Sequence, residues 1–360
     1  MISDTESPRT DWLRLAIASA IVVVLAYLFW TGSRYPALEE KAIMSGAIQL
    51  EDPLGFEAKF ALTEDMTVLE RMFWSTLNWI NTNKKGMTFG VLFAAAFLTA
   101  APYVRRKSFK GSFANSALGL VIGTPLGVCV NCAAPIARGM YSGGLRAETT
   151  LSAMIASPTL NVVVLTMLFS LVPFYMAVTK IALSLLVILV VVPLICRRLP
   201  QTQLPPAQRV NTVPPAPQPG VHHALKDVVI SYFRNLWYIF KMTVPLMLLA
   251  GIMGAIVATL LPQNLITGLS FSLVALILIA LVGVFLPVPI AFDVVVTGAL
   301  LGIGLSHGYV MALLFTLGSF SIYSFFIVAQ SVGRRAAVQL GASVAVLGML
   351  AGAGSHYYHE

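Results

Sequence analysis

Two cysteines stand three residues apart, at Cys129 and Cys132, in a segment that is otherwise apolar enough to lie in a membrane. Asn131, two glycines and two prolines share this segment, residues 123–135 (GTPLGVCVNCAAP), and interrupt a helix there. At that spacing both sulfur atoms reach one face of a helical turn or one concavity of a loop. Thiolates bind soft ions, and a Cys-x-x-Cys pair also suits thiol–disulfide exchange. The alternative is that both side chains are small buried apolar groups.

We expect Cys129 and Cys132 to hold a soft metal or metalloid as a substrate rather than as a resident ion. A structural zinc site needs four ligands, and no second ligand pair stands at a suitable spacing. The chain also lacks a Walker A loop, a His-Glu-x-x-His motif and a Gly-x-Ser-x-Gly motif. We therefore expect neither an enzyme nor a bound cofactor.

A second polar interruption follows in the next apolar run, at residues 157–161 (SPTLN). Its proline frees backbone carbonyls, and Ser157, Thr159 and Asn161 either satisfy the freed groups or face a ligand. The functional interpretation adds these three side chains, with Asn131, to the substrate site. The alternative is a proline kink that the hydroxyl groups repair.

The carboxylate of Asp293 is the one acidic group deep in the second half of the chain. A carboxylate inside a membrane is costly, so Asp293 is a candidate substrate-site residue, as a proton carrier or the partner of a cation. The alternative is a structural pair with Arg138 or a backbone donor. We expect Lys180 to extend outward to the interface, and we expect Arg138, Arg146 and Glu148 to lie near the cytoplasmic face.

The composition is that of a membrane protein. The chain of 360 residues is 58% hydrophobic and 11% charged, with a mean hydropathy of +0.83, whereas soluble domains carry about 25% charged residues. Several runs approach or exceed the ~18 apolar residues that span a bilayer. We expect an all-α polytopic membrane protein in contact with the lipid bilayer. The net charge of +8 fits basic loops held in the cytoplasm, with no nucleic acid as partner.

Residues 1–86 are expected to form an N-terminal transmembrane helix and an extracytoplasmic loop. The helix covers residues 13–30 and has no small-residue cleavage site after it, so we interpret it as uncleaved. Residues 32–86 hold eight of the fifteen acidic residues, and the basic residues on either side place the N-terminus inside and this loop outside. Apolar residues at helical spacing within 69–80 predict either a surface helix or a small packed cap.

A first transmembrane repeat is expected over residues 87–198. It starts with a span over 87–104 and continues with the interrupted segment 113–143, which we interpret as a re-entrant hairpin. Two spans follow, and Arg197 and Arg198 close the repeat inside. Residues 199–226 are rich in proline and are expected to form a semi-rigid cytoplasmic linker.

A second repeat is expected over residues 227–354, with the same order of one span, one broken segment and two spans. Its broken segment is interrupted at Pro287 and Pro289. The first repeat enters the membrane from outside and the second from inside, which is the arrangement of inverted-topology repeats with discontinuous helices. A shift of 160 residues pairs Gly123 with Gly283 and Gly144 with Gly304.

These motifs resemble the bacterial predicted-permease family that includes the organoarsenical efflux permease ArsP and the YraQ-like permeases. The resemblance rests on residues 123–135, on Gly143 and Gly144, and on residues 156–161 (ASPTLN), and it extends over about residues 85 to 350. It implies a bacterial inner-membrane exporter, with members linked to trivalent or methylated arsenic. The chain departs from the tighter Cys-x-Cys-Gly run of many relatives, since it has Cys-Val-Asn-Cys followed by Ala133.

The sequence thus predicts an inner-membrane permease that exports a soft, thiol-reactive solute such as a trivalent or methylated arsenical or antimonite. One alternative is a membrane thiol–disulfide oxidoreductase, for which Cys196 is the one remaining partner cysteine. Another is a permease for a non-metal small solute, and a third is an assembly factor that docks through residues 32–86. The sequence leaves open whether the chain forms a homo-oligomer.

Overall fold

The computed structural model describes most of the chain, and every regular element in the described part is a helix. Residues 35–58 and 64 of the expected extracytoplasmic loop and most of the expected proline-rich linker fall outside the described residues, which are 12–34, 59–63, 65–103, 109, 111–198, 220–260, 271–302 and 304–359. The prediction of an all-helical protein is confirmed.

The first helix packs along the side of the helical body. α1 (Trp12–Phe29) ends in a π-helical turn at Trp30–Arg34 and matches the helix expected over residues 13–30. At one end, Arg14 forms an ion pair of 2.6 Å with Asp227. At the other end, the ring of Phe29 stacks on Phe89, with 3.7 Å between centroids. Contacts at both ends therefore fix α1 against the two helices that carry these partners.

A single long helix, α3 (Val68–Ala100), replaces the two elements expected over residues 69–104. It begins with a capping box, in which the Thr67 hydroxyl accepts from the Glu70 backbone N–H and the Glu70 carboxylate accepts from the Thr67 backbone N–H. The expected surface helix runs straight into the expected span because Trp79, at their junction, is fully buried. The boundary expected at residue 86 falls inside this helix.

The remaining helices of the first half are short and interrupted where glycine, proline and asparagine predict it. The chain leaves helical geometry between α4 and α5, and again between α6 and α7. These helices are α4 (Ser112–Gly123), which ends in a 3-10 turn at Thr124–Leu126, α5 (Val130–Ser142), α6 (Ala147–Thr159), α7 (Val162–Leu171), and α8 (Phe174–Leu186), which continues through Val187–Val191 into α9 (Val192–Arg198).

The second half repeats this order. Its first helix, α10, begins inside the linker expected over residues 199–226 and includes His222 and His223. The interruption expected at Pro287 and Pro289 is confirmed between α11 and α12. The helices are α10 (Val221–Leu260), α11 (Leu273–Phe285), α12 (Phe292–Gly302), α13 (His307–Ser319), α14 (Ile322–Ser331) and α15 (Arg334–His359).

The helix boundaries of the two halves differ by a constant 160 residues over much of their length. Adding 160 to the bounds of α6 gives 307 and 319, which are the bounds of α13. The same sum takes α7 onto α14 and the start of α8 onto the start of α15. Gly144 and Gly304, also 160 apart, both have positive φ, at 87° and 83°. The offset of 160 residues suggested by the sequence is therefore repeated in the helix boundaries and in the backbone conformation of these two glycines.

The described helices are long and apolar enough for a multi-pass membrane protein. Four single helices are long and apolar enough to cross a membrane, and the number rises to six when each bent pair of helices is counted as one span. The bent pairs are α6 with α7, at 42°, and α13 with α14, at 43°. Equal bends at equivalent positions agree with the repeat.

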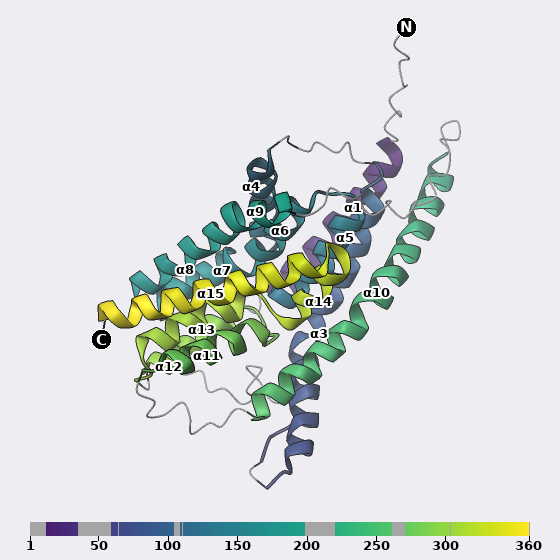
Figure 1. Cartoon of the computed structure of the whole chain (residues 1–360). Coiled ribbons are helices and arrows are strands. Elements are labelled where there is room, and N and C mark those ends of the chain that lie inside the picture. Colours follow the sequence, from purple (N-terminus) through teal and green to yellow (C-terminus); the bar gives the residue numbers. More distant parts are fainter. Residues whose placement is uncertain are drawn as a thin grey trace.

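The two halves interlock in the middle of the molecule (Figure 1). α3 and α10 lie side by side on one flank, and α15 packs along α13. α5 of the first half packs against α14 of the second, and α12 of the second packs against α7 of the first. Since α12 and α14 occupy the same positions in the second half as α5 and α7 in the first, this cross-packing is reciprocal.

Glycine allows two of these helices to approach closely. A Cβ atom at Gly123 of α4 would lie 2.5 Å from the carbonyl oxygen of Ala153 on α6, and at Gly119 it would lie 2.7 Å from the Ser152 Cβ. Small residues of this kind drive helix association in lipid, where close backbone contact replaces the hydrophobic effect.

We predict that Gly123→Ala lowers the free energy of unfolding by about 1–3 kcal/mol, because the added methyl group collides with backbone atoms. Gly302→Ala is the matched control, since no atom lies within 4 Å of its Cβ position, and we expect a change of less than about 0.5 kcal/mol. Equilibrium unfolding in mixed detergent micelles measures both. Equal stability of the two variants would contradict the close packing of α4 on α6.

Candidate functional site

The two cysteines lie at the start of α5, immediately after a break in the chain. Gly127 has a φ of 55°, a left-handed conformation that favours glycine, and the chain then turns into α5. Cys129 is the N-cap residue, and its sulfur accepts a hydrogen bond of 3.3 Å from the backbone N–H of Cys132. Both thiols are enclosed, with 4% and 1% of the residues exposed, and neither is in a disulfide.

Helix α3 forms one wall around the thiols. A Cβ atom at Gly86 would lie 2.7 Å from the Cys132 sulfur, and at Gly90 it would lie 2.8 Å from the Cys132 carbonyl oxygen. These two glycines stand one helical turn apart and leave just enough room for the first turn of α5. Sequence reasoning missed the contact of α3 with the thiols, because glycines in an apolar helix have many uses.

Asn131, between the two cysteines, connects the first half of the chain to the second. Its amide group donates to the Val288 carbonyl over 3.1 Å, and its carbonyl accepts from the Ser321 hydroxyl over 3.3 Å. Val288 lies in the break before α12, and Ser321 is the N-cap residue of α14. A third link joins the Ser324 hydroxyl to the Val130 carbonyl, at 3.4 Å. Asn131 therefore holds three breaks together.

The break between α11 and α12 receives a further donor from α3. The indole N–H of Trp79 donates to the Pro287 carbonyl over 2.5 Å. Ala291 in the same break has a φ of 60°, which is uncommon for a residue with a side chain. Backbone at this depth needs protein partners, and Trp79 and Asn131 supply them.

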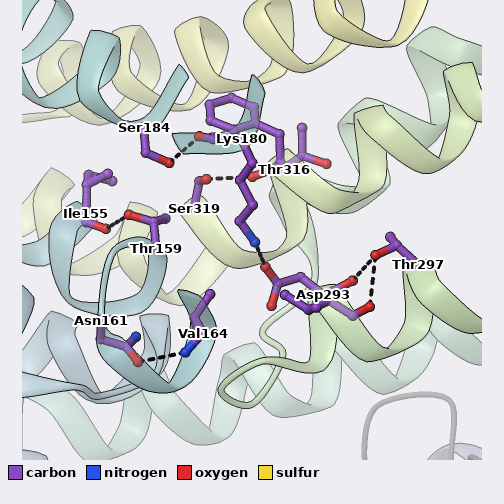
Figure 2. Close-up of polar contacts among 12 residues, drawn as sticks. Ile155, Thr159, Asn161, Val164, Lys180, Ser184, Asp293, Thr297, Thr316 and Ser319 are labelled. Carbon is purple, nitrogen blue, oxygen red and sulfur yellow. Dashed lines mark hydrogen bonds and ion pairs between the residues drawn. The ribbon is translucent and has the colours of Figure 1, made fainter. Parts of the chain in front are cut away.

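Of the three polar residues predicted in 157–161, Ser157 contacts the cysteine segment. Its hydroxyl oxygen accepts from the Val128 backbone N–H over 3.2 Å. Thr159 donates to the Ile155 carbonyl at 2.6 Å, and Asn161 caps α7 by accepting from the Val164 N–H at 3.0 Å (Figure 2). The last two contacts are those of the alternative interpretation, in which polar side chains repair a kink.

Asp293 pairs with Lys180, which corrects two expectations. Lys180 does not extend outward: it is fully buried on α8, and its ammonium group reaches the Asp293 carboxylate at the start of α12 (Figure 2). The pairing of Asp293 with Arg138 considered from the sequence is also wrong, because Arg138 bonds to Gln330 over 3.0 Å. Arg138 is itself buried within the protein, and its place near the cytoplasmic face stays a prediction.

Gly318 of α13 lies directly against the Asp293 carboxylate, so any side chain there would displace it. The nearby hydroxyls of Ser184 and Thr297 donate to main-chain carbonyls of their own helices, at 2.8 and 2.6 Å. Each of the two buried charges, on Lys180 and on Asp293, is consequently stabilised mainly by the other. Sequence reasoning selected Asp293 but could not find its partner, which is 113 residues away.

The third cysteine lies apart from the pair. Cys196 on α9 is close enough to Glu148 and Arg146 to interact with their charges, and those two residues form an ion pair of 3.4 Å. This is the end of the molecule that the sequence assigns to the cytoplasmic side. Among the described residues no three histidine, cysteine or acidic side chains group as a metal site. The pair of Cys129 and Cys132 is therefore the candidate for binding a soft ion in this part of the chain.

An apolar groove of about 540 Å³ runs between α3 and α10. Trp79 and Met87 line it from α3, and Trp237 and Met247 line it from α10. Trp79 thus contacts both the groove and the break before α12.

We predict that Lys180→Met lowers the free energy of unfolding by about 3–5 kcal/mol, because it leaves the buried Asp293 charge without a partner. The double variant Lys180→Met with Asp293→Asn should recover most of this loss, since no charge then remains. Lys241→Met, which removes an exposed lysine, is the control. Unfolding in mixed micelles tests the pair, and a double variant no more stable than Lys180→Met would contradict this account.

Comparison with known proteins agrees with the family suggested by the motifs. A family model described as predicted permease, ArsP_1, matches residues 86–357. The UPF0718 protein YraQ of Escherichia coli (strain K12) is 26% identical over 359 residues, which is 97% of this chain and 96% of that protein. No solved structure matches the chain. The family match covers both halves, the four breaks and the Lys180–Asp293 pair, and on this evidence the chain belongs to the predicted permease family.

Proposed function

We propose that this permease exports a soft, thiol-reactive solute across the bacterial inner membrane and holds it at Cys129 and Cys132. The observation that carries the proposal is the meeting of all four chain breaks through polar contacts around the start of α5. Solute sites in transporters are built from interrupted helices of this kind, near the middle of the bilayer. Trivalent or methylated arsenicals and antimonite have the chemistry that a thiol pair prefers.

The proposal includes two inverted repeats, residues 87–198 and 227–354. The constant offset of 160 residues supports a repeat, and the reciprocal packing of α5 with α14 and of α12 with α7 supports a two-fold relation between the halves. If α4 and α5 form a re-entrant hairpin, each repeat has an odd number of crossings and the second enters inverted. Residues 1–11 and 199–226 then face the cytoplasm, and the part of residues 32–86 that precedes α3 faces outside. Trp79 and Gly86 of α3 instead lie at the proposed site, against Pro287 and Cys132.

The polar groups around the thiols have distinct roles in this proposal. Asn131 and Ser157 hold the breaks in place and offer contacts to the solute when the halves move apart. Thr159 and Asn161 keep the α6–α7 bend in shape. The N-termini of α5 and α14 lie close together, because Asn131 and Ser321 bond, and both carry partial positive charge.

Asp293 and Lys180 supply the charge coupling. A proton that enters from water and binds the Asp293 carboxylate removes its negative charge, and the attraction that holds α8 to α12 is then lost. Since α12 follows the break that Asn131 contacts, release of this pair would loosen the second half of the site. Both thiols are covered in the described conformation, so solute entry requires some such movement.

We predict that changing both Cys129 and Cys132 to serine abolishes resistance to methylarsenite, arsenite or antimonite in a host that lacks its own exporters of these compounds. Serine keeps the size and the N-cap hydrogen bond but has little affinity for soft ions. Growth inhibition and uptake into everted membrane vesicles measure the effect, with protein amount determined in the same membranes.

Cys196→Ser is the matched control, and we expect it to retain resistance and transport. Unchanged transport of all three compounds by the double variant would remove the soft-ligand proposal. Because the thiol-to-serine change is nearly isosteric, loss of protein from the membrane would identify a folding effect, and Cys129→Ala with Cys132→Ala would then be compared at matched expression.

A further inference from the structure

Arg138 is a buried cation without a carboxylate partner among the described residues. It lies on α5 six residues after Cys132, and 6% of it is exposed. One of its terminal nitrogens donates to Gln330 of α14 over 3.0 Å, and its guanidinium lies 5.7 Å from the centre of the Tyr238 ring on α10. Its Nε atom has no hydrogen-bond partner in the described part of the chain. Both contacts orient the group, but neither neutralises its charge.

Tyr323 brings a second buried donor to the packed pair of α5 and α14. This residue of α14 is fully buried, and its hydroxyl lies beside that of Thr243 but donates to no acceptor among the described residues. The neighbouring Thr243 already donates its hydroxyl to the Ile239 carbonyl over 2.7 Å. Arg138 and Cys132 lie on α5, the helix that packs against α14, and Cys129 is its N-cap residue.

The packing of α5 against α14 explains why these groups meet. Contacts between Asn131 and Ser321 join the first turns of the two helices, and the contact between Arg138 and Gln330 joins them about two turns later. The two helices therefore run side by side in the same direction. Tyr323 lies between these contacts along α14, and α10 covers the pair through Tyr238 and Thr243.

A buried charge and two buried donors without acceptors are expensive, so a native protein keeps them for a ligand or a bound water. An N–H group, an O–H group and a positive charge together call for an anion that accepts hydrogen bonds. The surrounding thiols offer weak acceptors only. Lipid head groups are excluded as the source because both side chains are buried within protein.

We propose that Arg138 and Tyr323 form a binding subsite for a carboxylate or similar oxyanion, next to the thiol pair. The ligand that uses the subsite together with the thiols is a solute with both a soft, thiol-reactive centre and an acidic group. Six residues of helix separate Cys132 from Arg138 by about 9 Å along the axis, a span that an aromatic acid or a short peptide conjugate can bridge. The combined ligand rests on the proposed function, whereas the anion subsite alone does not.

The test measures binding of benzoate and of its neutral counterpart benzamide to the purified full chain in lipid nanodiscs, by titration calorimetry against empty nanodiscs. We expect benzoate to bind at least tenfold more tightly than benzamide. Arg138→Gln should remove this preference, and Tyr323→Phe should weaken benzoate about fivefold through loss of one hydrogen bond. Arg335→Gln removes an exposed arginine and should change nothing.

The variant with serine at both Cys129 and Cys132 separates this proposal from the proposed function, because it should bind benzoate as well as the natural chain does. Equal affinities for benzoate and benzamide in the natural chain would overturn the subsite and would show that water alone fills it. Retention of the preference by Arg138→Gln would overturn it as well. If Arg138→Gln does not fold, Tyr323→Phe decides, since it removes one hydroxyl oxygen and keeps the buried ring.

Discussion

A polypeptide that leaves helical geometry inside a membrane has to find hydrogen-bond partners in the protein, because lipid offers none. In the part of the chain that the structure describes this happens four times, and the breaks satisfy one another. The Asn131 amide donates to Val288 in the break between α11 and α12, and its carbonyl accepts from Ser321 at the break between α13 and α14. Ser157, just before the break between α6 and α7, accepts from the Val128 N–H in the break between α4 and α5. The two halves therefore cannot be placed independently. The position of the thiols, the reciprocal packing of short helices and the closeness of two helix N-termini all follow from this mutual satisfaction.

Charge follows the same constraint with two different outcomes. Lys180 and Asp293 neutralise each other within the protein, and the surrounding hydroxyl groups are occupied by their own helices. Arg138 is held by an amide and an aromatic ring, so its hydrogen bonds are partly satisfied while its charge is not. A buried pair is compatible with a purely structural role, but a buried lone cation is difficult to explain without a ligand. On the proposals made above, the pair belongs to the moving parts of the permease and Arg138 to its binding surface.

Local chemistry predicted the breaks, and distant packing decided the rest. Glycine, proline and asparagine disrupt helices through their own backbones, so the interruptions near Cys129, Asn161 and Pro287 could be located from sequence. The continuity of α3 could not, because it depends on burial of Trp79 against a glycine of α10 and a carbonyl of another break. The partner of Asp293 was equally hidden, since a lysine in an apolar run has the same sequence pattern whether it reaches the interface or a buried acid. In the sequence the offset of 160 residues was visible only as a few identical residues, and in the structure the bounds of equivalent helices differ by the same 160 residues.

The residue between the cysteines shows how spacing can combine two tasks. In the first turn of a helix, positions 129 and 132 share a face, whereas position 131 points to a different side. Cys132 accordingly lies against Gly86 of α3, and Asn131 reaches the second half of the chain. A tighter pair, with one residue between the sulfurs, would put the two thiols on different faces and leave no equivalent position for the bridging amide. The Cys-Val-Asn-Cys spacing therefore lets one turn of α5 present both sulfurs together while its amide fastens the two halves, so a solute that moves the thiols also acts on the joint between the halves.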